Sequence, residues 1–201
     1  MIIIGAGGHA KVVIELWRAL GVEPQGLLAE AGPPSLLGVP LLGRPLEAER
    51  LRREGIDRAA VAVGDNAARE RLAAALVRLG FALPPAVHPA ARVSPSAEIG
   101  AGSVVLPSAV IAAAARVGPL AIINHAAVVD HDAALEQAVH IGPGAVLAGE
   151  VRVGARSLVG AGAVVKPGVT IGADVLVGAG AVVVRPVPAG LRVMGVPARP
   201  V

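Results

Sequence analysis

Aliphatic residues recur at every sixth position through the second part of the chain. From Val87 to Val183, seventeen consecutive positions at this spacing are Val, Ile or Leu, and the register never slips. The residue four positions after each of them is always Ala, Ser or Val, and the residue directly after is Gly seven times. A period of six fits neither a helix nor the alternation of a flat strand. It predicts a parallel β-helix, in which short strands joined by tight turns each send one aliphatic side chain into a narrow core.

The small residues of this repeat explain an unusual composition. Hydrophobic residues make up 54% of the 201-residue chain, yet Trp17 and Phe81 are its only aromatic residues. A core that is one side chain wide has no room for aromatic rings. With three hexads per coil, the 102 residues from Val87 to Pro188 correspond to about 5.7 coils.

The first 85 residues follow a different pattern, in which short apolar runs alternate with segments of helical spacing. We expect strands at residues 1–4, 25–30 and 59–63, and helices at residues 9–21, 45–54 and 66–80. Such alternation favours a parallel sheet, so this part should be a small α/β domain, a Rossmann-like half-domain. Pro84 and Pro85 mark its end. The chain therefore divides into an α/β domain at residues 1–85 and a β-helix domain with a C-terminal tail at residues 86–201.

A glycine-rich turn follows the first predicted strand and opens the first predicted helix. Its sequence is GAGGH at residues 5–9, with the spacing Gly5-x-Gly7-x-x-Ala10. Free backbone N–H groups at such a turn can hold a phosphate, and Glu30 lies where a ribose-binding acid could follow. The glycines could equally serve only to permit a tight turn. An 85-residue domain is half of a dinucleotide fold, so a mononucleotide or a nucleotide-sugar fits better than NAD.

Composition excludes several classes of protein. The chain contains no cysteine, which removes disulfides, thiolate metal sites and a cysteine nucleophile. Its longest stretch without a charged residue, at residues 99–115, is interrupted by glycine, serine and proline, so we expect no membrane span. The N-terminus lacks the basic segment of a signal peptide, which predicts a cytoplasmic protein.

The charge distribution argues against nucleic acid as a partner. The net charge is +3, with 10 basic and 9 acidic residues at positions 1–86 and 8 basic and 6 acidic residues at positions 87–201. Neither part has a basic block, and almost no aromatic side chains are present on which bases could stack.

Two parts of the sequence together resemble one family of bacterial enzymes. One is the GAGGH turn on a small α/β domain, and the other is the segment NHAAVVDHD at residues 124–132 of the hexapeptide repeat. Further matching segments are GDN at 64–66 with Arg69, VHIGPGA at 139–145, AG at 148–149 and GVPA at 195–198. The combination is similar to the hexapeptide-repeat sugar acetyltransferases, which include the sialic-acid O-acetyltransferase type and the UDP-4-amino-sugar N-acetyltransferases of bacillosamine-type pathways.

The resemblance implies a left-handed β-helix, a homotrimer with active sites in the clefts between neighbouring coils, and acetyl-CoA as cosubstrate. The acceptor would be a nucleotide-sugar, above all a UDP-amino sugar, or a sialic-acid-like sugar. N- and O-acetylation use the same base and the same thioester, so the motifs leave the choice between them open.

The resemblance also implies roles for individual residues of the solenoid. His131 would be the general base that takes a proton from the attacking amine or hydroxyl, and Asp132 would orient its imidazole. His140 would contact the acetyl group of acetyl-CoA, and the backbone N–H of Gly149 would face its carbonyl oxygen. Asn124 would lie near the acceptor sugar.

On the α/β domain, the resemblance implies a nucleotide-sugar site lined by Gly7, Gly8, His9 and Gly64. Members of the family often end the second strand with two acids, whereas this chain has Ala29 followed by Glu30. We therefore expect its contact with the base or the ribose to differ.

The chemistry of acyl transfer independently fits these residue types. The attack of an amine or hydroxyl on a thioester needs a base that works near pH 7, which imidazole provides, and a hydrogen-bond donor for the oxyanion. His125 and His131 lie outside the two inward-facing columns, so neither fills the core. Either could still be only a solvated surface residue, and Asp130 is interpreted as a turn residue.

Two other functions stay open on the sequence. Zinc enzymes of the γ-carbonic-anhydrase type use the same solenoid with three histidines at a subunit interface. His125, His131 and His140 are spaced six and nine residues apart, which does not match that group, so no metal is expected. The third hypothesis is a non-catalytic trimeric scaffold whose α/β domain binds a nucleotide.

Overall fold

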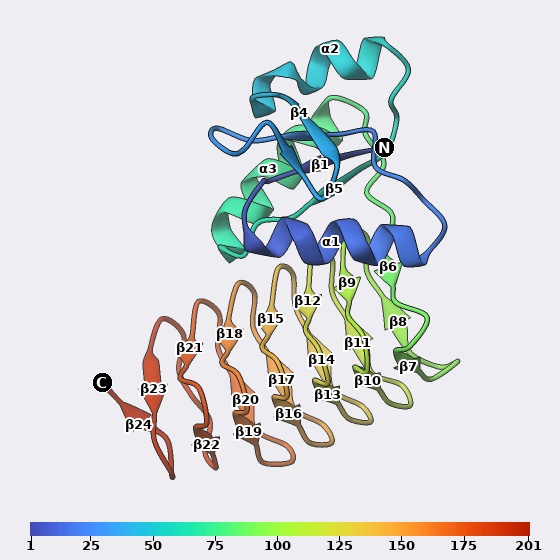
Figure 1. The fold of residues 1–201 in the computed structure, drawn as a ribbon. Helices are drawn as coiled ribbons and strands as arrows, with labels where there is room; N and C mark the ends of the chain where they lie inside the picture. The colour runs from blue at the N-terminus through green and yellow to red at the C-terminus, as the bar shows by residue number, and fades with distance from the viewer. The chain divides into compact units, whose positions relative to one another are not determined.

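The computed structural model describes all 201 residues, and they divide into two compact units. Met1–Ala86 form an α/β unit and Val87–Val201 form a solenoid (Figure 1). None of the helices combines the length and the apolar character that a membrane span requires.

A five-stranded sheet forms the centre of the α/β unit. Its strands lie in the order β3 (Ser35–Leu36), β4 (Val39–Gly43), β2 (Gly26–Leu28), β1 (Ile2–Ile4) and β5 (Ala59–Val61). The strand β1 pairs in parallel with β2 on one side and with β5 on the other. Every residue of β1, β2 and β5 is buried, which is typical of a parallel sheet covered on both faces.

The helices of this unit are α1 (Gly8–Ala19), α2 (Ala48–Arg53) and α3 (Asn66–Arg78). In α1 the buried residues recur at helical spacing, as in Ala10, Val13, Ile14 and Trp17, so one apolar face lies toward the core. The predicted helix at 45–54 begins as a 3₁₀ turn, η1 (Pro45–Glu47), before α2. The other two helices end two residues earlier than predicted.

The hairpin of β3 and β4 is absent from the prediction, which gave this sheet three strands. Ser35 pairs with Pro40 and Leu36 with Val39 across a two-residue turn. Leu37 and Gly38 in that turn both have positive φ, 49° and 81°, as a type I′ turn requires. Leucine is an unusual residue at positive φ, so the sequence carries only a weak turn signal here.

The solenoid follows the predicted hexad register without a slip. Each aliphatic position from Val87 to Val183 is the second residue of a two-residue strand. The strands are β6 (Ala86–Val87), β7 (Arg92–Val93), β8 (Glu98–Ile99), β9 (Val104–Val105), β10 (Val110–Ile111), β11 (Arg116–Val117), β12 (Ile122–Ile123), β13 (Val128–Val129), β14 (Ala134–Leu135), β15 (His140–Ile141), β16 (Val146–Leu147), β17 (Arg152–Val153), β18 (Leu158–Val159), β19 (Val164–Val165), β20 (Thr170–Ile171), β21 (Leu176–Val177) and β22 (Val182–Val183). Two further strands, β23 (Arg192–Met194) and β24 (Arg199–Pro200), complete the C-terminal end.

Three sheets run the length of the solenoid (Figure 1). We name them by their first strands: the β6 sheet (β6, β9, β12, β15, β18, β21, β23, β24), the β7 sheet (β7, β10, β13, β16, β19, β22) and the β8 sheet (β8, β11, β14, β17, β20). Strands 18 residues apart pair in parallel, as Val110 does with Val128. One coil is therefore three hexads, and the predicted parallel β-helix is confirmed.

Close stacking of the coils explains the recurrent glycine. A Cβ at Gly118 would lie 2.7 Å from the carbonyl oxygen of Leu135 in the next coil. Only glycine permits that approach, because the neighbouring atom belongs to backbone and cannot move away cheaply.

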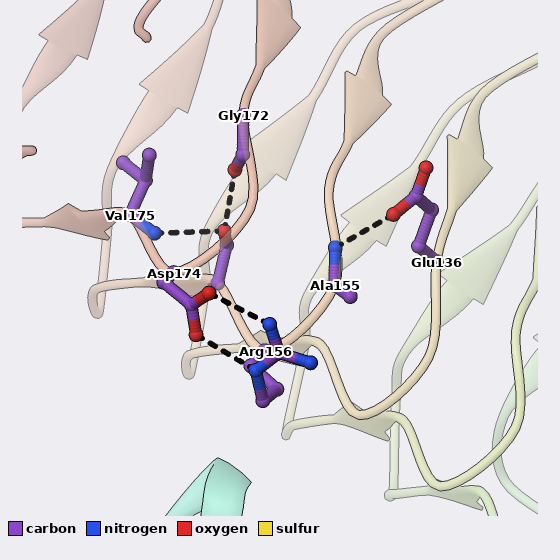
Figure 2. A network of polar contacts seen from close by, with 7 residues as sticks. Glu136, Ala155, Arg156, Gly172, Asp174 and Val175 are labelled. Atoms are coloured by element: carbon purple, nitrogen blue, oxygen red, sulfur yellow. Dashed lines mark hydrogen bonds and ion pairs between the residues drawn. The ribbon is translucent and has the colours of Figure 1, made fainter. Parts of the chain in front are cut away.

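Two serines replace the small apolar residue of the second inward column, and both are fully buried. The hydroxyl of Ser157 donates to the carbonyl of Gly172 (2.6 Å) and accepts from the N–H of Val175 (3.0 Å). Figure 2 labels Gly172 and Val175 and draws both bonds as dashed lines. Beside it, Arg156 forms a two-pronged ion pair with Asp174 of the next coil, at 2.8 and 2.7 Å. These contacts tie adjacent coils together where the β8 sheet turns into the β6 sheet.

Candidate active site

His131 lies in the turn between β13 and β14, where the β7 sheet passes into the β8 sheet. Oδ2 of Asp132 lies 2.9 Å from its Nδ1, and Oδ1 of Asp130 accepts a hydrogen bond from its backbone N–H at 2.7 Å. Because a carboxylate can only accept, Nδ1 of the neutral ring carries the hydrogen. The other ring nitrogen, Nε2, is then free to take up a proton.

The backbone of this turn is held on both sides by neighbouring coils. The N–H of Asp132 donates to the carbonyl of Ala113 (3.0 Å), and the N–H of Glu150 donates to the carbonyl of His131 (2.9 Å). Asp132 itself has φ of +59°, a left-handed conformation that aspartate adopts more readily than most residues. The imidazole therefore projects from a rigid support.

Gly149, one coil further along the chain, lies directly against the His131 ring. A Cβ at this glycine would be 2.4 Å from Nε2 and 2.5 Å from Cε1 of His131. The amide N–H of Gly149 makes no hydrogen bond within the chain. The predicted base and the predicted oxyanion donor therefore come together on one edge of the solenoid.

The surroundings of His131 favour its protonated form. The hydrogen bond to Asp132, followed by the charge of Asp130, raises the pKa of His131 above its ordinary 6.5, and Asp132 and Glu150 add smaller charge effects. The side chain is exposed, so burial opposes this only weakly. The ring is a stronger base than a free imidazole.

A second group of polar side chains forms around Asn124, in the turn after β12. Nδ2 of Asn124 lies 3.2 Å from Nε2 of His140, which is the first residue of β15. Oδ1 of Asn124 lies 2.8 Å from Nδ1 of His125 and also accepts from the backbone N–H of that residue. The predicted acceptor and acetyl contacts, Asn124 and His140, therefore touch each other.

The two groups lie at different places on the coil. His131, Asp132 and Gly149 occupy the turns from the β7 sheet to the β8 sheet, whereas Asn124 occupies a turn from the β6 sheet to the β7 sheet and His140 lies on the β6 sheet. One chain by itself does not join them into one site.

The predicted nucleotide-binding turn of the α/β unit lies between β1 and α1. Gly5 has φ of +120°, and a Cβ there would be 2.6 Å from the carbonyl oxygen of Ala62, so only glycine fits. Gly7 and Gly8 are exposed, and no atom lies within 4 Å of a Cβ added to either. His9 is half-buried in the first turn of α1.

The start of α1 is an open helix terminus. Gly7 is its N-cap and has no side chain to bond the first amides, and the first turn contains no acidic residue. In contrast, the Asp65 carboxylate caps α3 by accepting from the N–H of Ala68 at 2.7 Å. Of the two helix starts, α1 is therefore the one suited to an anionic ligand.

The loop after β5 contains Gly64 and is held from behind by a buried arginine, Arg69 of α3. Its guanidinium donates to the carbonyls of Val63 (3.0 Å) and Gly64 (3.2 Å) and to Oδ1 of Asn66 (2.8 Å). Burial lowers the pKa of Arg69 to about 10. In the sequence, Arg69 stands out only as part of the family resemblance. Its spacing from the buried residues Ala73 and Leu76 places it on the core-facing side of the helix, which was the signal that could have found it.

The loop after β2 also reaches this edge of the sheet. A Cβ at Gly32 would be 2.8 Å from Cβ of Ala6, so this loop packs against the glycine-rich turn. Glu30, the predicted ribose contact, is exposed and lies 3.9 Å from Arg44, and Ala29 bonds Gly43 through its backbone N–H.

No three His, Cys, Asp or Glu side chains of the chain come close enough together to hold a metal ion. The histidines of the zinc-enzyme hypothesis are thus not assembled within one chain: His131 lies at a different turn from His125, and His140 lies on strand β15 of the β6 sheet.

Two protein families match parts of the chain. The family "PglD N-terminal domain" matches residues 1–76, and the family "Bacterial transferase hexapeptide (six repeats)" matches residues 150–185. No curated protein matches the chain.

Several solved structures resemble the chain over its whole length. PerB from Caulobacter crescentus, in complex with CoA and GDP-perosamine, is 49% identical over 100% of this chain and 96% of its own, with a TM-score of 0.97. A histidine-to-asparagine variant of perosamine N-acetyltransferase from the same organism, with the same two ligands, is 48% identical over 100% and 95%, with a TM-score of 0.98. The acetyltransferase domain of PglB from Neisseria gonorrhoeae, in complex with acetyl coenzyme A, is 45% identical over 100% and 98%, with a TM-score of 0.95.

These likenesses confirm the predicted fold class, an α/β unit followed by a left-handed parallel β-helix of hexapeptide repeats.

Proposed function

The chain belongs to the hexapeptide-repeat sugar acetyltransferases, and we propose that it transfers the acetyl group of acetyl-CoA to the amine of a nucleotide-activated amino sugar. The observation that carries this proposal is the contact of the His131–Asp132 pair with Gly149, which puts a base beside a free N–H donor. The GDP-perosamine bound by relatives supports the acceptor class, and their CoA and acetyl-CoA support the donor.

In the proposed reaction, Nε2 of His131 takes a proton from the sugar amine as its nitrogen attacks the thioester carbonyl. Asp132 holds the ring through Nδ1 and stabilises the imidazolium that forms. The N–H of Gly149 donates to the oxyanion of the tetrahedral intermediate. When the C–S bond breaks, His131 returns its proton to the CoA sulfur, and the products are the N-acetylated sugar and free CoA.

The α/β unit would bind the nucleotide of the acceptor. We assign its diphosphate to the open N-terminus of α1, at Gly7 and Gly8, with Gly64 beside them and His9 in the first turn. Because relatives bind GDP-perosamine, GDP-activated sugars join the UDP-amino sugars as candidate acceptors. A reaction that consumes acetyl-CoA and a nucleotide-activated sugar needs a compartment that supplies both, so we propose that it takes place in the cytoplasm.

We propose a homotrimer as the active assembly, on the basis of the outward faces of the solenoid. The first residue of each strand faces outward, and on the β7 sheet five of these are valines in register: Val110, Val128, Val146, Val164 and Val182. The same positions of the β8 sheet are Glu98, Arg116, Ala134, Arg152 and Thr170. The valine ladder is partly exposed, with Val164 the most open, and such an apolar strip beside a polar sheet is typical of an interface.

Threefold packing would also unite the two halves of the site. In a cyclic trimer each copy uses two different faces. If the β7 sheet packs on the β6 sheet of the next copy, the His131 turn comes beside the sheet that carries His140 of the partner subunit. Val146→Lys should then give monomers by light scattering and abolish turnover, while Thr170→Lys on the β8 sheet leaves both unchanged. A monomeric wild-type enzyme with full activity would refute the trimer.

Thiol release from acetyl-CoA tests the proposed reaction. The acceptors are GDP-perosamine, UDP-4-amino sugars and sialic acids, each with the wild-type protein and with His131→Ala. We expect turnover with one nucleotide-activated amino sugar, and a kcat about 10²–10⁴-fold lower in the variant with little change in the KM for acetyl-CoA.

His88→Ala is the matched control, because His88 is also a solenoid histidine but bonds its own turn, with Nδ1 accepting from Ala90. This variant should keep full activity. Unchanged turnover in His131→Ala would remove that residue from the base role. CoA binding without turnover of any acceptor would favour the scaffold, and activity lost on chelation would favour the zinc enzyme.

A further inference from the structure

Arg69 is the largest charged side chain buried in the protein, with 1% of its surface exposed. It lies on the face of α3 that also buries Ala73 and Leu76, where an apolar residue would normally pack. Burying a guanidinium is costly unless its donors are used. Two of its hydrogen bonds go to the loop after β5, at the carbonyls of Val63 and Gly64, and a third goes to the side chain of Asn66, the first residue of α3.

These bonds set the direction of two amide N–H groups. Across a trans peptide, the carbonyl of one residue and the N–H of the next point in opposite directions. Since the carbonyls of Val63 and Gly64 face Arg69 in the interior, the N–H groups of Gly64 and Asp65 face away from it. Neither N–H makes a hydrogen bond within the chain, and Gly64 and Asp65 are exposed.

The two N–H groups lie at the same edge of the sheet as the glycine-rich turn. β1 and β5 are adjacent and parallel, with Ile4 opposite Val61, and the N–H of Ala62 donates to the carbonyl of Ile4 at 2.7 Å. The loops that follow the two strands therefore begin side by side. Neither Gly64 nor Gly8 has an atom within 4 Å of an added Cβ, so the space in front of both loops is open.

We propose that Arg69 is a positioning residue for the nucleotide-sugar, which holds the loop after β5 so that the N–H groups of Gly64 and Asp65 bind the diphosphate together with the start of α1. This rests on the function proposed above. Arg69 acts from behind the loop and does not touch the ligand. Nη1 of Arg69 bonds both carbonyls and Nη2 bonds Asn66, so a lysine could take over the carbonyls but lacks the second nitrogen of the planar fork that holds Asn66.

Steady-state kinetics of Arg69→Met and Arg69→Lys test the role. We expect the KM for the nucleotide-sugar to rise roughly 10-fold or more in Arg69→Met and less in Arg69→Lys. The kcat at saturation and the KM for acetyl-CoA should stay near the wild-type values, because the chemistry takes place on the solenoid. The fluorescence of Trp17, the only tryptophan and a buried residue of α1, reports whether the α/β unit stays folded.

Two controls separate positioning from simple destabilisation. Arg71→Met removes an exposed arginine from the same helix and should change no kinetic constant. Leu76→Ala removes a buried side chain from α3 and should lower the unfolding temperature without raising the KM for the nucleotide-sugar.

An unchanged KM in Arg69→Met, or an equal rise in Leu76→Ala, would overturn the positioning role while the proposed function stands. If the wild-type enzyme shows no saturable dependence on any nucleotide-sugar, the proposed function fails instead, and the role of Arg69 fails with it.

Discussion

Replacing Gly149 by alanine would show how strongly catalysis depends on the position of the His131 ring. The new Cβ would lie 2.4 Å from Nε2 of His131, which is about 1 Å inside ordinary van der Waals contact. The ring is the part that can move, because it ends an exposed side chain, whereas residue 149 is fixed between coils. A displacement of about 1 Å from a reacting group can cost roughly 10²-fold in rate. The amide N–H of residue 149 is retained, so the oxyanion contact is preserved.

Thiol-release kinetics with both substrates varied should therefore give a kcat about 100-fold lower for Gly149→Ala. Gly162→Ala is the control, since Gly162 is also a turn residue of the solenoid but has no atom within 4 Å of an added Cβ. Its φ is +65°, and alanine already occupies the equivalent left-handed turn position at Ala126 and Ala138. Its activity should stay within about two-fold of wild type. In a His131→Ala background, Gly149→Ala should have no further effect, because both changes act through one ring. An additional 100-fold loss in that background would refute the reasoning.

Three further predictions concern the pKa of His131, the buried Ser157 of the solenoid and the open space at Gly8. Asp132 and Asp130 raise the pKa of His131 above 6.5, so the base stays protonated and inactive up to a higher pH than a free imidazole would. Asp132→Asn should therefore move the acidic limb of the kcat–pH profile to lower pH. A limb that stays in place would contradict this. Ser157→Ala leaves the buried N–H of Val175 and the partly buried carbonyl of Gly172 without their partner, so denaturant unfolding should show a loss of about 1–3 kcal/mol. Ser96→Ala should be nearly neutral, because the bond that Ser96 accepts from Ala114 is exposed and water can replace it. Gly8→Leu should fold normally, because the space there is open. It should raise the KM for the nucleotide-sugar roughly tenfold or more and leave the KM for acetyl-CoA unchanged. An unchanged KM for the nucleotide-sugar would show that the diphosphate does not bind at the start of α1.

The solenoid could be predicted in detail because its pattern is local and repeated. Each of the seventeen hexad positions from Val87 to Val183 ends a strand, since each hexad alone decides which side chain enters the core. The α/β unit was predicted less completely. The turn of its hairpin consists of Leu37 and Gly38. Leucine rarely adopts positive φ, so the sequence gives no recognisable turn signal there.

Part of the candidate site could likewise be predicted from the sequence, and part could not. His131 and Asp132 are neighbours in the sequence, so their hydrogen bond required only a turn that lets the carboxylate reach Nδ1. The bond between Asn124 and His140 joins two coils, and resemblance had suggested a role for each without suggesting that they touch. Arg69 was noted without a role, because the carbonyls it holds belong to a loop that precedes its helix.

By itself, the sequence determined the two-part organisation, the six-residue register and the residue types needed for acyl transfer. The reason is that strand spacing, turn chemistry and side-chain pKa are properties of short segments. Only the tertiary structure decided that His131 lies against Gly149, that its turn is separated from the sheet of His140, and that Arg69 faces the loop of Gly64. Those outcomes depend on how closely coils stack and where buried donors find acceptors, which are contacts between segments distant along the chain.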